Sequence, residues 1–129
     1  MQYLLDTVAV VRHFTGSGMI GRAASEILDS VERRGDLLAI SVVSLMEILY
    51  LFEKGRVPLS LSDAIEQIDN SAKYLIINLT PEILETASSV EFYELHDRLI
   101  LATAKWLGVP ILSSDRAFQD VPGIHVIWK

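Results

Sequence analysis

The chain has 129 residues, half of them apolar, and a formal net charge of −6 at pH 7. A chain of this length suits one domain, and we expect residues 1–129 to form a single domain. The absence of cysteine excludes disulfides, thiolate zinc sites and cysteine nucleophiles, and the acidic balance argues against passive nucleic-acid binding through a basic face.

Apolar runs and helical periodicity predict alternating strands and helices. In chain order we expect a strand at residues 3–5, a helix over about 19–33, a strand at 37–40, a helix from 44 toward 54, a helix from 62 to about 73, a strand at 74–79, a helix from 80 to about 90, a helix over 97–107, and strands at 111–112 and 124–127. This alternation indicates an α/β fold with three layers, α/β/α, and a mostly parallel central sheet of about five strands.

Four carboxylates stand at the edges of these apolar segments: Asp6, Glu47, Asp97 and Asp115. Asp6 and Asp115 follow predicted strands, Asp97 opens a predicted helix, and Glu47 lies in the first turns of another. In an open α/β sheet such positions converge outside the carboxyl ends of the strands. Converging carboxylates suit Mg²⁺ or Mn²⁺, which prefer oxygen ligands. The pattern therefore predicts a divalent-metal site and phosphodiester chemistry, in which the cation reverses the local negative charge.

Each acid also has a structural explanation. Asp6 is a suitable helix cap, Ser44 and Glu47 match a capping box, Asp97 gains from the dipole of its helix, and Asp115 fits an Asx turn. On this alternative the acids are caps, and the protein is a non-catalytic interaction module whose excess of apolar residues contacts a partner.

Residues beside the acids are candidates for supporting roles. Thr7 offers a hydroxyl at the same rim, and Arg98 and Arg116 can each hold a phosphate bidentately. Asp120 follows in a polar loop and is a weaker candidate. A receiver-like signalling domain, another α/β fold with acids and Mg²⁺ at one rim, is a less favoured alternative, because only Asp6 follows the first strand and no acceptor aspartate follows the third.

Four motifs give the full chain a resemblance to PIN-domain proteins, and within that family to the small VapC-type toxins of toxin–antitoxin pairs. They are Leu4-Leu5-Asp6-Thr7, Ser41-x-x-Ser44-x-x-Glu47, His96-Asp97-Arg98-Leu99-Ile100 leading into Ala102-Thr103-Ala104, and Leu112-Ser113-Ser114-Asp115. The order of these motifs in a chain of this length makes the resemblance fairly specific.

The resemblance implies a Mg²⁺- or Mn²⁺-dependent endoribonuclease that forms a homodimer and is held inactive by a cognate antitoxin protein. The family's acidic quartet falls on Asp6, Glu47, Asp97 and Asp115, and its hydroxyl two places before the last acid falls on Ser113. We expect Asp6, Asp97 and Asp115 to bind the metal and Glu47 to orient or deprotonate the attacking water.

The sequence departs from the family pattern at one point and carries no membrane signal. Val8 stands where the family often has Asn or His. The N-terminus lacks the basic start of a signal peptide, and no apolar run reaches the length of a membrane span. We therefore expect a cytoplasmic protein, and the family resemblance implies that it acts on RNA.

Overall fold

Five parallel strands form the centre of the fold in the computed structural model, which describes residues 1–129. The strands are β1 (Gln2–Leu5), β2 (Leu37–Ser41), β3 (Tyr74–Ile77), β4 (Ile111–Leu112) and β5 (Val126–Ile127), in the spatial order β3-β2-β1-β4-β5. Every neighbouring pair is parallel. The carboxyl ends of all five strands therefore lie at one edge of the sheet, as the sequence predicts.

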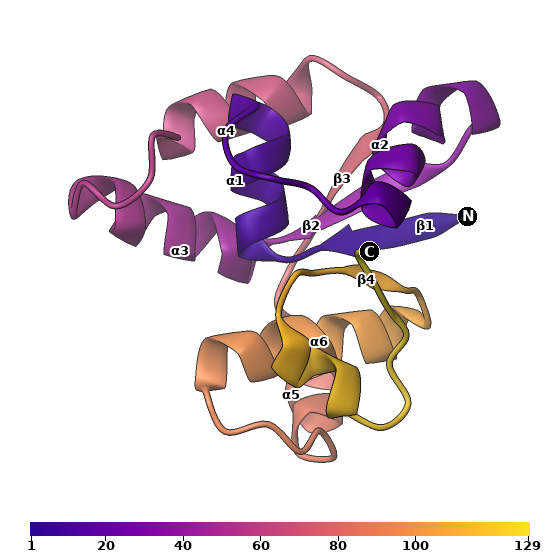
Figure 1. Ribbon diagram of the computed structural model, residues 1–129. Helices are drawn as coiled ribbons and strands as arrows, with labels where there is room; N and C mark the ends of the chain where they lie inside the picture. The colour runs from indigo at the N-terminus through magenta and orange to yellow at the C-terminus, as the bar shows by residue number, and fades with distance from the viewer.

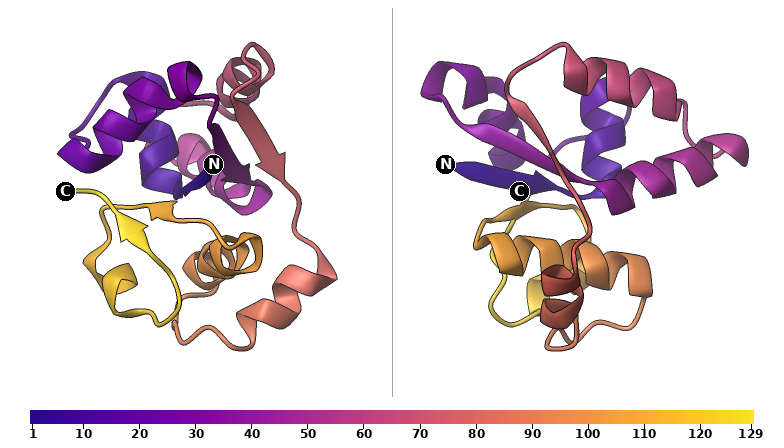
Figure 2. Two further views of the ribbon diagram at one scale, coloured as in Figure 1. Left: turned by 90° about the vertical axis from the view of Figure 1, so that its right-hand side faces the viewer. Right: turned by 180° about the vertical axis from the view of Figure 1, so that it is seen from behind.

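Helices cover both faces of the sheet, so the fold has the three predicted layers (Figure 1). The helices are α1 (Thr7–Thr15), α2 (Arg22–Arg34), α3 (Val42–Glu53), α4 (Leu61–Asp69), α5 (Pro81–Ala87), α6 (Leu95–Leu107) and the 3-10 helix η1 (Arg116–Asp120). The helices α1 to α4 lie on one side of the sheet, and α5, α6 and η1 lie on the other (Figures 1 and 2). None of the helices combines the length and the apolar composition that crossing a bilayer would require.

The central strands are apolar on both faces because each face packs against helices. In β1, Leu5 belongs to the buried cluster under α1, α2 and α4, whereas Leu4 points into the cluster under α5 and α6. In β2, Ile40 and Ala39 divide between the same two clusters. Successive side chains of a strand alternate between its faces, so both clusters are fixed by the same short strands.

The structure differs from the sequence expectations at several helix starts. Helix α1 follows β1 with only Asp6 between them. The predicted elements contained no helix there, although Asp6 was a suitable cap for one. Helix α3 begins at Val42 with Ser41 as its N-cap, so the predicted start at Ser44 is wrong. The cap of α4 is Ser60 and not residue 62. In each case the residue that caps the helix is the one that the preceding strand or loop leaves in an extended backbone conformation.

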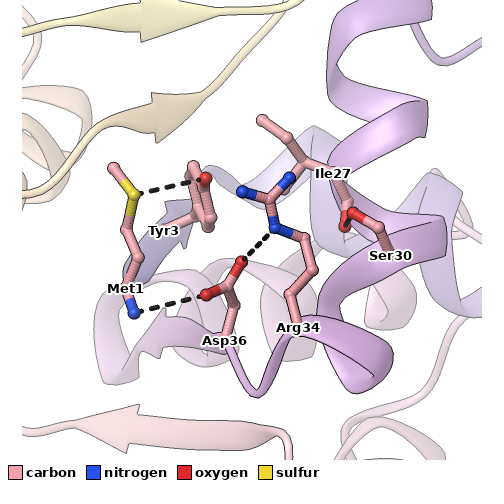
Figure 3. A network of polar contacts seen from close by, with 6 residues as sticks. All are labelled: Met1, Tyr3, Ile27, Ser30, Arg34 and Asp36. Atoms are coloured by element: carbon pink, nitrogen blue, oxygen red, sulfur yellow. Dashed lines mark hydrogen bonds and ion pairs between the residues drawn. The ribbon is translucent and has the colours of Figure 1, made fainter.

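A polar network anchors the amino-terminal edge of the sheet, opposite the predicted site (Figure 3). The N-terminal ammonium of Met1 lies 3.3 Å from Oδ1 of Asp36, and Nε of Arg34 lies 3.7 Å from its Oδ2. Asp36 immediately precedes β2, and Met1 precedes β1. These ion pairs therefore tie the starts of the two central strands together at the edge that carries no predicted catalytic residue.

Candidate active site

Asp6 is held rigidly at the carboxyl end of β1. It is the N-cap of α1, and its Oδ1 accepts a hydrogen bond from the backbone N–H of Ala9 at 2.8 Å. The hydroxyl of Ser113, two residues before Asp115, donates to Oδ2. The Asp6 side chain is only 6% exposed. The helix-cap explanation is thus correct for Asp6, but it accounts for only one of the two carboxylate oxygens.

Glu47 is not part of a capping box. Ser41 caps α3, and Ser44 is fully buried one turn before Glu47. The Oγ1 atom of Thr7 lies 2.5 Å from Oε1 of Glu47 and 3.0 Å from Oγ of Ser44. Because the Thr7 hydroxyl has one proton, the shorter contact assigns it to Glu47, and Ser44 then donates to Thr7. This chain of hydroxyls orients Glu47 and leaves its Oε2 atom without a protein partner.

Asp97 is free of the capping role because Glu94 performs it. The two carboxylate oxygens of Glu94 accept from the backbone N–H groups of His96, at 2.7 Å, and of Asp97, at 3.2 Å. Helix α6 accordingly begins at Leu95, and Asp97 is its third residue. The side chain of Asp97 is half-buried and makes no hydrogen bond within the protein. A capping function therefore does not explain this carboxylate.

Asp115 combines a cap with a position beside the other acids. It is the N-cap of η1, and its Oδ1 accepts from the backbone N–H of Ala117 at 2.9 Å, as the predicted Asx turn requires. Its own backbone N–H donates to Ser113 Oγ at 3.1 Å. The hydroxyl of Ser113 therefore links Asp115 to Asp6.

The four carboxylates are near enough for their charges to interact. Burial, together with the negative charges of Asp115 and Glu47, raises the pKa of Asp6 to about 6, although the hydrogen bonds from Ser113 and Ala9 oppose the shift. Burial also raises the pKa of Asp97 to about 6, and the charges of Glu94, Glu47, Asp115 and Asp6 add to the effect. Mutual repulsion of this kind is relieved when a cation lies between the carboxylates.

A second group of possible ligands overlaps this cluster. One ligand atom from each of Glu47, Glu94 and His96 lies within 4.8 Å of the others, and Nδ1 of His96 lies 3.3 Å from Oε2 of Glu94. Glu94 is not among the residues predicted from the sequence. Glu94 stands three residues before Asp97, at the N-cap position of the helix, and this spacing is the sequence signal that could have identified it.

The supporting residues divide into those that touch the cluster and those that do not. Thr7 and Ser113 each donate to a cluster carboxylate, as described above. Arg98 instead donates its Nε–H to the carbonyl of Ala87 at 2.8 Å and so links the end of α5 to α6. Arg116 is exposed directly after Asp115, and Val8 is 44% exposed directly after Thr7. Asp120 is exposed at the end of η1 and stands apart from the hydrogen bonds of the cluster.

Comparison with known proteins assigns the fold. The family model of the PIN domain matches residues 3–124. The chain belongs to the PIN domain family. The match contains all four carboxylates, so the acids that meet at the sheet edge lie within the PIN domain. A comparison with curated proteins finds no match.

Solved structures of toxin–antitoxin complexes share this PIN fold. A chain of VapBC2 from Rickettsia felis, bound to a fragment of promoter DNA, is similar with a TM-score of 0.75 over 100% of both chains at 16% identity. A chain of DNA-bound VapBC from Salmonella typhimurium gives a TM-score of 0.70 over 98% of this chain and 97% of that one at 17% identity. VapC20 from Mycobacterium tuberculosis, described as a Sarcin-Ricin loop cleaving toxin, gives 0.65 over 98% and 99% at 14% identity.

Proposed function

We propose that this PIN-domain protein is a Mg²⁺- or Mn²⁺-dependent endoribonuclease and the toxin of a toxin–antitoxin pair. The observation that carries the proposal is the convergence of Asp6, Glu47, Asp97 and Asp115 from four separate parts of the chain, with the pKa of Asp6 and of Asp97 raised to about 6. A fold does not collect repelling carboxylates for stability alone, because each ionised group loses solvation there.

The donor set fits a hard divalent cation. The side chains at the cluster offer carboxylate oxygens, which are the ligands that Mg²⁺ and Mn²⁺ prefer. Asp97 has both oxygens free of protein donors, and Asp6 and Asp115 are oriented by their caps and by Ser113. We assign Asp6, Asp97 and Asp115 as the residues that hold the metal. A bound cation would neutralise phosphate charge and lower the pKa of a coordinated water.

The remaining residues position the attacking water and accept its proton. The hydroxyl of Thr7 fixes Oε1 of Glu47, which leaves Oε2 to accept that proton as the water oxygen attacks phosphorus and the bond to the leaving oxygen breaks. Ser113 donates to the carboxylate of Asp6 and accepts from the backbone N–H of Asp115, and so holds these two residues beside each other. Arg116, exposed beside Asp115, is the arginine that we assign to a substrate phosphate.

Two kinds of protein partner belong to the same proposal. The similarity to chains of VapBC complexes supports a cognate antitoxin. Large apolar side chains are exposed on α3, namely Met46, Leu49, Tyr50 and Phe52. They support an interface with another chain, which we assign to a homodimer, and we assign the protein to the cytoplasm. The alternative of a non-catalytic interaction module is favoured by the caps made by Asp6 and Asp115. It leaves Glu47 without a role and gives Asp97 only a favourable interaction with the dipole of α6.

A metal titration tests the proposal without knowledge of the substrate. Mn²⁺ is titrated into the protein and into Asp97→Asn, and Asp63→Asn is the matched control. Asp63 is likewise the third residue of a capped helix, α4, and its backbone N–H donates a hydrogen bond to the side chain of Ser60. Asp63 itself is exposed, away from the carboxylate cluster. We expect saturable binding that Asp97→Asn weakens about tenfold or more and Asp63→Asn leaves unchanged. Equal binding by all three proteins would contradict the assignment.

Cleavage is tested on total cellular RNA, because the target is not specified by the site. The protein and Asp97→Asn are incubated with the RNA and Mg²⁺ or Mn²⁺, and the 5′ ends of the fragments are sequenced. We expect discrete new ends that require both the metal and Asp97. Metal binding without any Asp97-dependent cleavage would contradict the ribonuclease.

A further inference from the structure

Two hollows in the surface flank the carboxylate cluster and carry positive charge. The first has a volume of about 270 Å³ and lies between α1 with the loop that follows it and the segment after α3. Its ionisable lining residues are Arg12 and Arg56, with no acid among them. The guanidinium of Arg12 is held by a hydrogen bond from Nη1 to the carbonyl of Met19 at 2.8 Å.

The second hollow is larger, about 990 Å³, and lies between η1 and the edge strand β5. Arg116 and Lys129 line it together with Ser114 and Gln119, and Asp120 is the one acid in its wall. Arg116 and Lys129 take part in no ion pair, so their charges are available to a ligand. Apart from Asp120, the ionisable and amide groups in this wall favour hydrogen-bond donation to an anion.

Each hollow reaches the cluster through a hydroxyl that touches a carboxylate. Thr7 lines the first hollow and contacts Glu47. Ser113 lines the second and donates to Asp6. Each basic hollow is therefore one hydroxyl away from a cluster carboxylate, Glu47 for the first and Asp6 for the second.

This arrangement is unusual for a chain of net charge −6. The ionisable lining residues of a third hollow are Glu47, Tyr50 and His96, and a fourth hollow on α2 balances Glu26 and Asp29 against Arg33 and Arg34. Among these four hollows, the two that contain Thr7 or Ser113 carry more basic than acidic side chains, whereas the hollow lined by Glu47 does not. Positive charge on both sides of an acidic centre suits a polyanion that crosses the centre.

We propose that a single strand of RNA crosses the carboxylate cluster, with its backbone phosphates held by Arg12 and Arg56 on one side and by Arg116 and Lys129 on the other. The inference rests on the proposed function and adds the path of the substrate. A single strand fits because its phosphates are accessible on all sides, whereas a duplex presents them on a rigid surface. The phosphate between the two pairs is then the one presented to the cluster.

The test measures binding of a labelled oligouridylate of about twelve nucleotides by fluorescence anisotropy over a series of salt concentrations in the presence of Mg²⁺. Every protein carries Asp97→Asn, so that cleavage does not interfere. The two variants are Arg12→Gln with Arg56→Gln, and Arg116→Gln with Lys129→Gln. Each lost phosphate contact lowers the slope of log affinity against log salt by about 0.7. We expect each pair to lower the slope by about 1.4 and the low-salt affinity by about tenfold or more.

The matched control is Arg33→Gln with Lys105→Gln, which removes two positive charges as each tested pair does, one from arginine and one from lysine. Both residues lie in the last turn of a helix that leads into the start of a strand, at the opposite edge of the sheet. We expect this control to leave the slope unchanged. Arg12→Gln removes the contact with Met19 and can loosen that loop, so Arg56→Gln alone, which breaks no hydrogen bond or ion pair, is measured as well, and we expect it to lower the slope by about 0.7.

The outcomes separate this inference from the proposed function. RNA binding that neither pair alters, that only one pair alters, or that the control pair reduces equally would overturn the crossing path and leave the ribonuclease intact. Absence of RNA binding by the Asp97→Asn parent would overturn the path and count against the ribonuclease too. Metal binding is measured separately on the unsubstituted protein, and its absence would show that the proposed metal site is wrong.

Discussion

At the scale of single residues, the four carboxylates of the cluster are held in different ways. Asp6 and Asp115 use one oxygen as a helix cap, Glu47 is oriented by the hydroxyl of Thr7, and Asp97 is left free because Glu94 caps its helix. Capping and metal binding are therefore compatible at this sheet edge, since a carboxylate has two oxygens and four lone-pair sites.

Replacing Thr7 by valine tests the orientation of Glu47. The shape of the side chain is kept, but the contact with Oε1 is lost and the hydroxyl of Ser44 loses its acceptor. We expect Asp97-dependent RNA cleavage to fall roughly ten- to a hundredfold, because a misplaced general base loses part of its contribution of about 10²- to 10⁴-fold. We expect Mn²⁺ affinity to stay within about twofold, because Glu47 is not among the residues assigned to the metal.

Thr7→Ser is the control for that measurement, because it keeps the hydroxyl. Cleavage close to that of the unsubstituted protein is expected for Thr7→Ser. If Thr7→Val also cleaves at the unsubstituted rate, the hydroxyl does not position Glu47.

At the scale of elements, the start of α6 decides which acid is available. Glu94 caps the helix with both oxygens, and Arg98 ties its first turns to the end of α5. The first turn of α6 is thus fixed by two side chains that do not belong to the predicted quartet. The position of Asp97 depends on these contacts rather than on any hydrogen bond of its own.

Glu94→Ala removes the cap and is expected to lower the free energy of unfolding by about 0.5–2 kcal/mol. Relief of the repulsion between Glu94 and Asp97 offsets part of this loss. Urea denaturation of the metal-free protein measures the change. Ser60→Ala, which removes the cap of α4, is the control and is expected to cost a similar amount without altering Mn²⁺ affinity. A Glu94→Ala protein as stable as its parent would show that the cap contributes nothing.

At the scale of the whole molecule, the site opposes the stability of the fold. The pKa of Asp6 is about 6 in the folded protein against 3.8 as its ordinary value, and the pKa of Asp97 is raised in the same way. The folded state therefore binds protons more tightly than the unfolded state, and the stabilising protons are lost as the pH rises through about 6. A bound cation compensates the same charges at neutral pH.

The melting temperature of the metal-free protein is accordingly expected to fall as the pH rises from about 4.5 to 7. For Asp6, the shift of about two pKa units corresponds to at most about 3 kcal/mol, or several degrees for a domain of this size. Mg²⁺ is expected to restore the melting temperature at pH 7 and to have little effect at pH 4.5. Thermal scans with Mg²⁺ or with a chelator measure both effects. A metal-free melting temperature that rises over this range would contradict the raised pKa values.

Much of the architecture follows from local sequence. The apolar runs that became β1 to β5, the helices between them other than α1, and the parallel sheet were predictable, because apolar periodicity and burial on both faces are properties of short segments. The sequence also placed Asp6 and Asp115 after strands of a parallel sheet, whose carboxyl ends lie at one edge. The PIN family match agrees with the resemblance carried by these motifs.

The tertiary structure alone decided which candidate performs which task. Helix α1 was not predicted, because a short β-branched run after a strand carries no clear helical signal until it packs on the sheet. Helix α3 is capped by Ser41 rather than by the predicted Ser44, and α6 is capped by Glu94 rather than opened by Asp97. Each choice depends on the backbone conformation that the preceding segment is forced to adopt. The contact between Thr7 and Glu47 joins residues 40 positions apart. Local sequence specifies which groups can bond, but packing determines which of them come within reach.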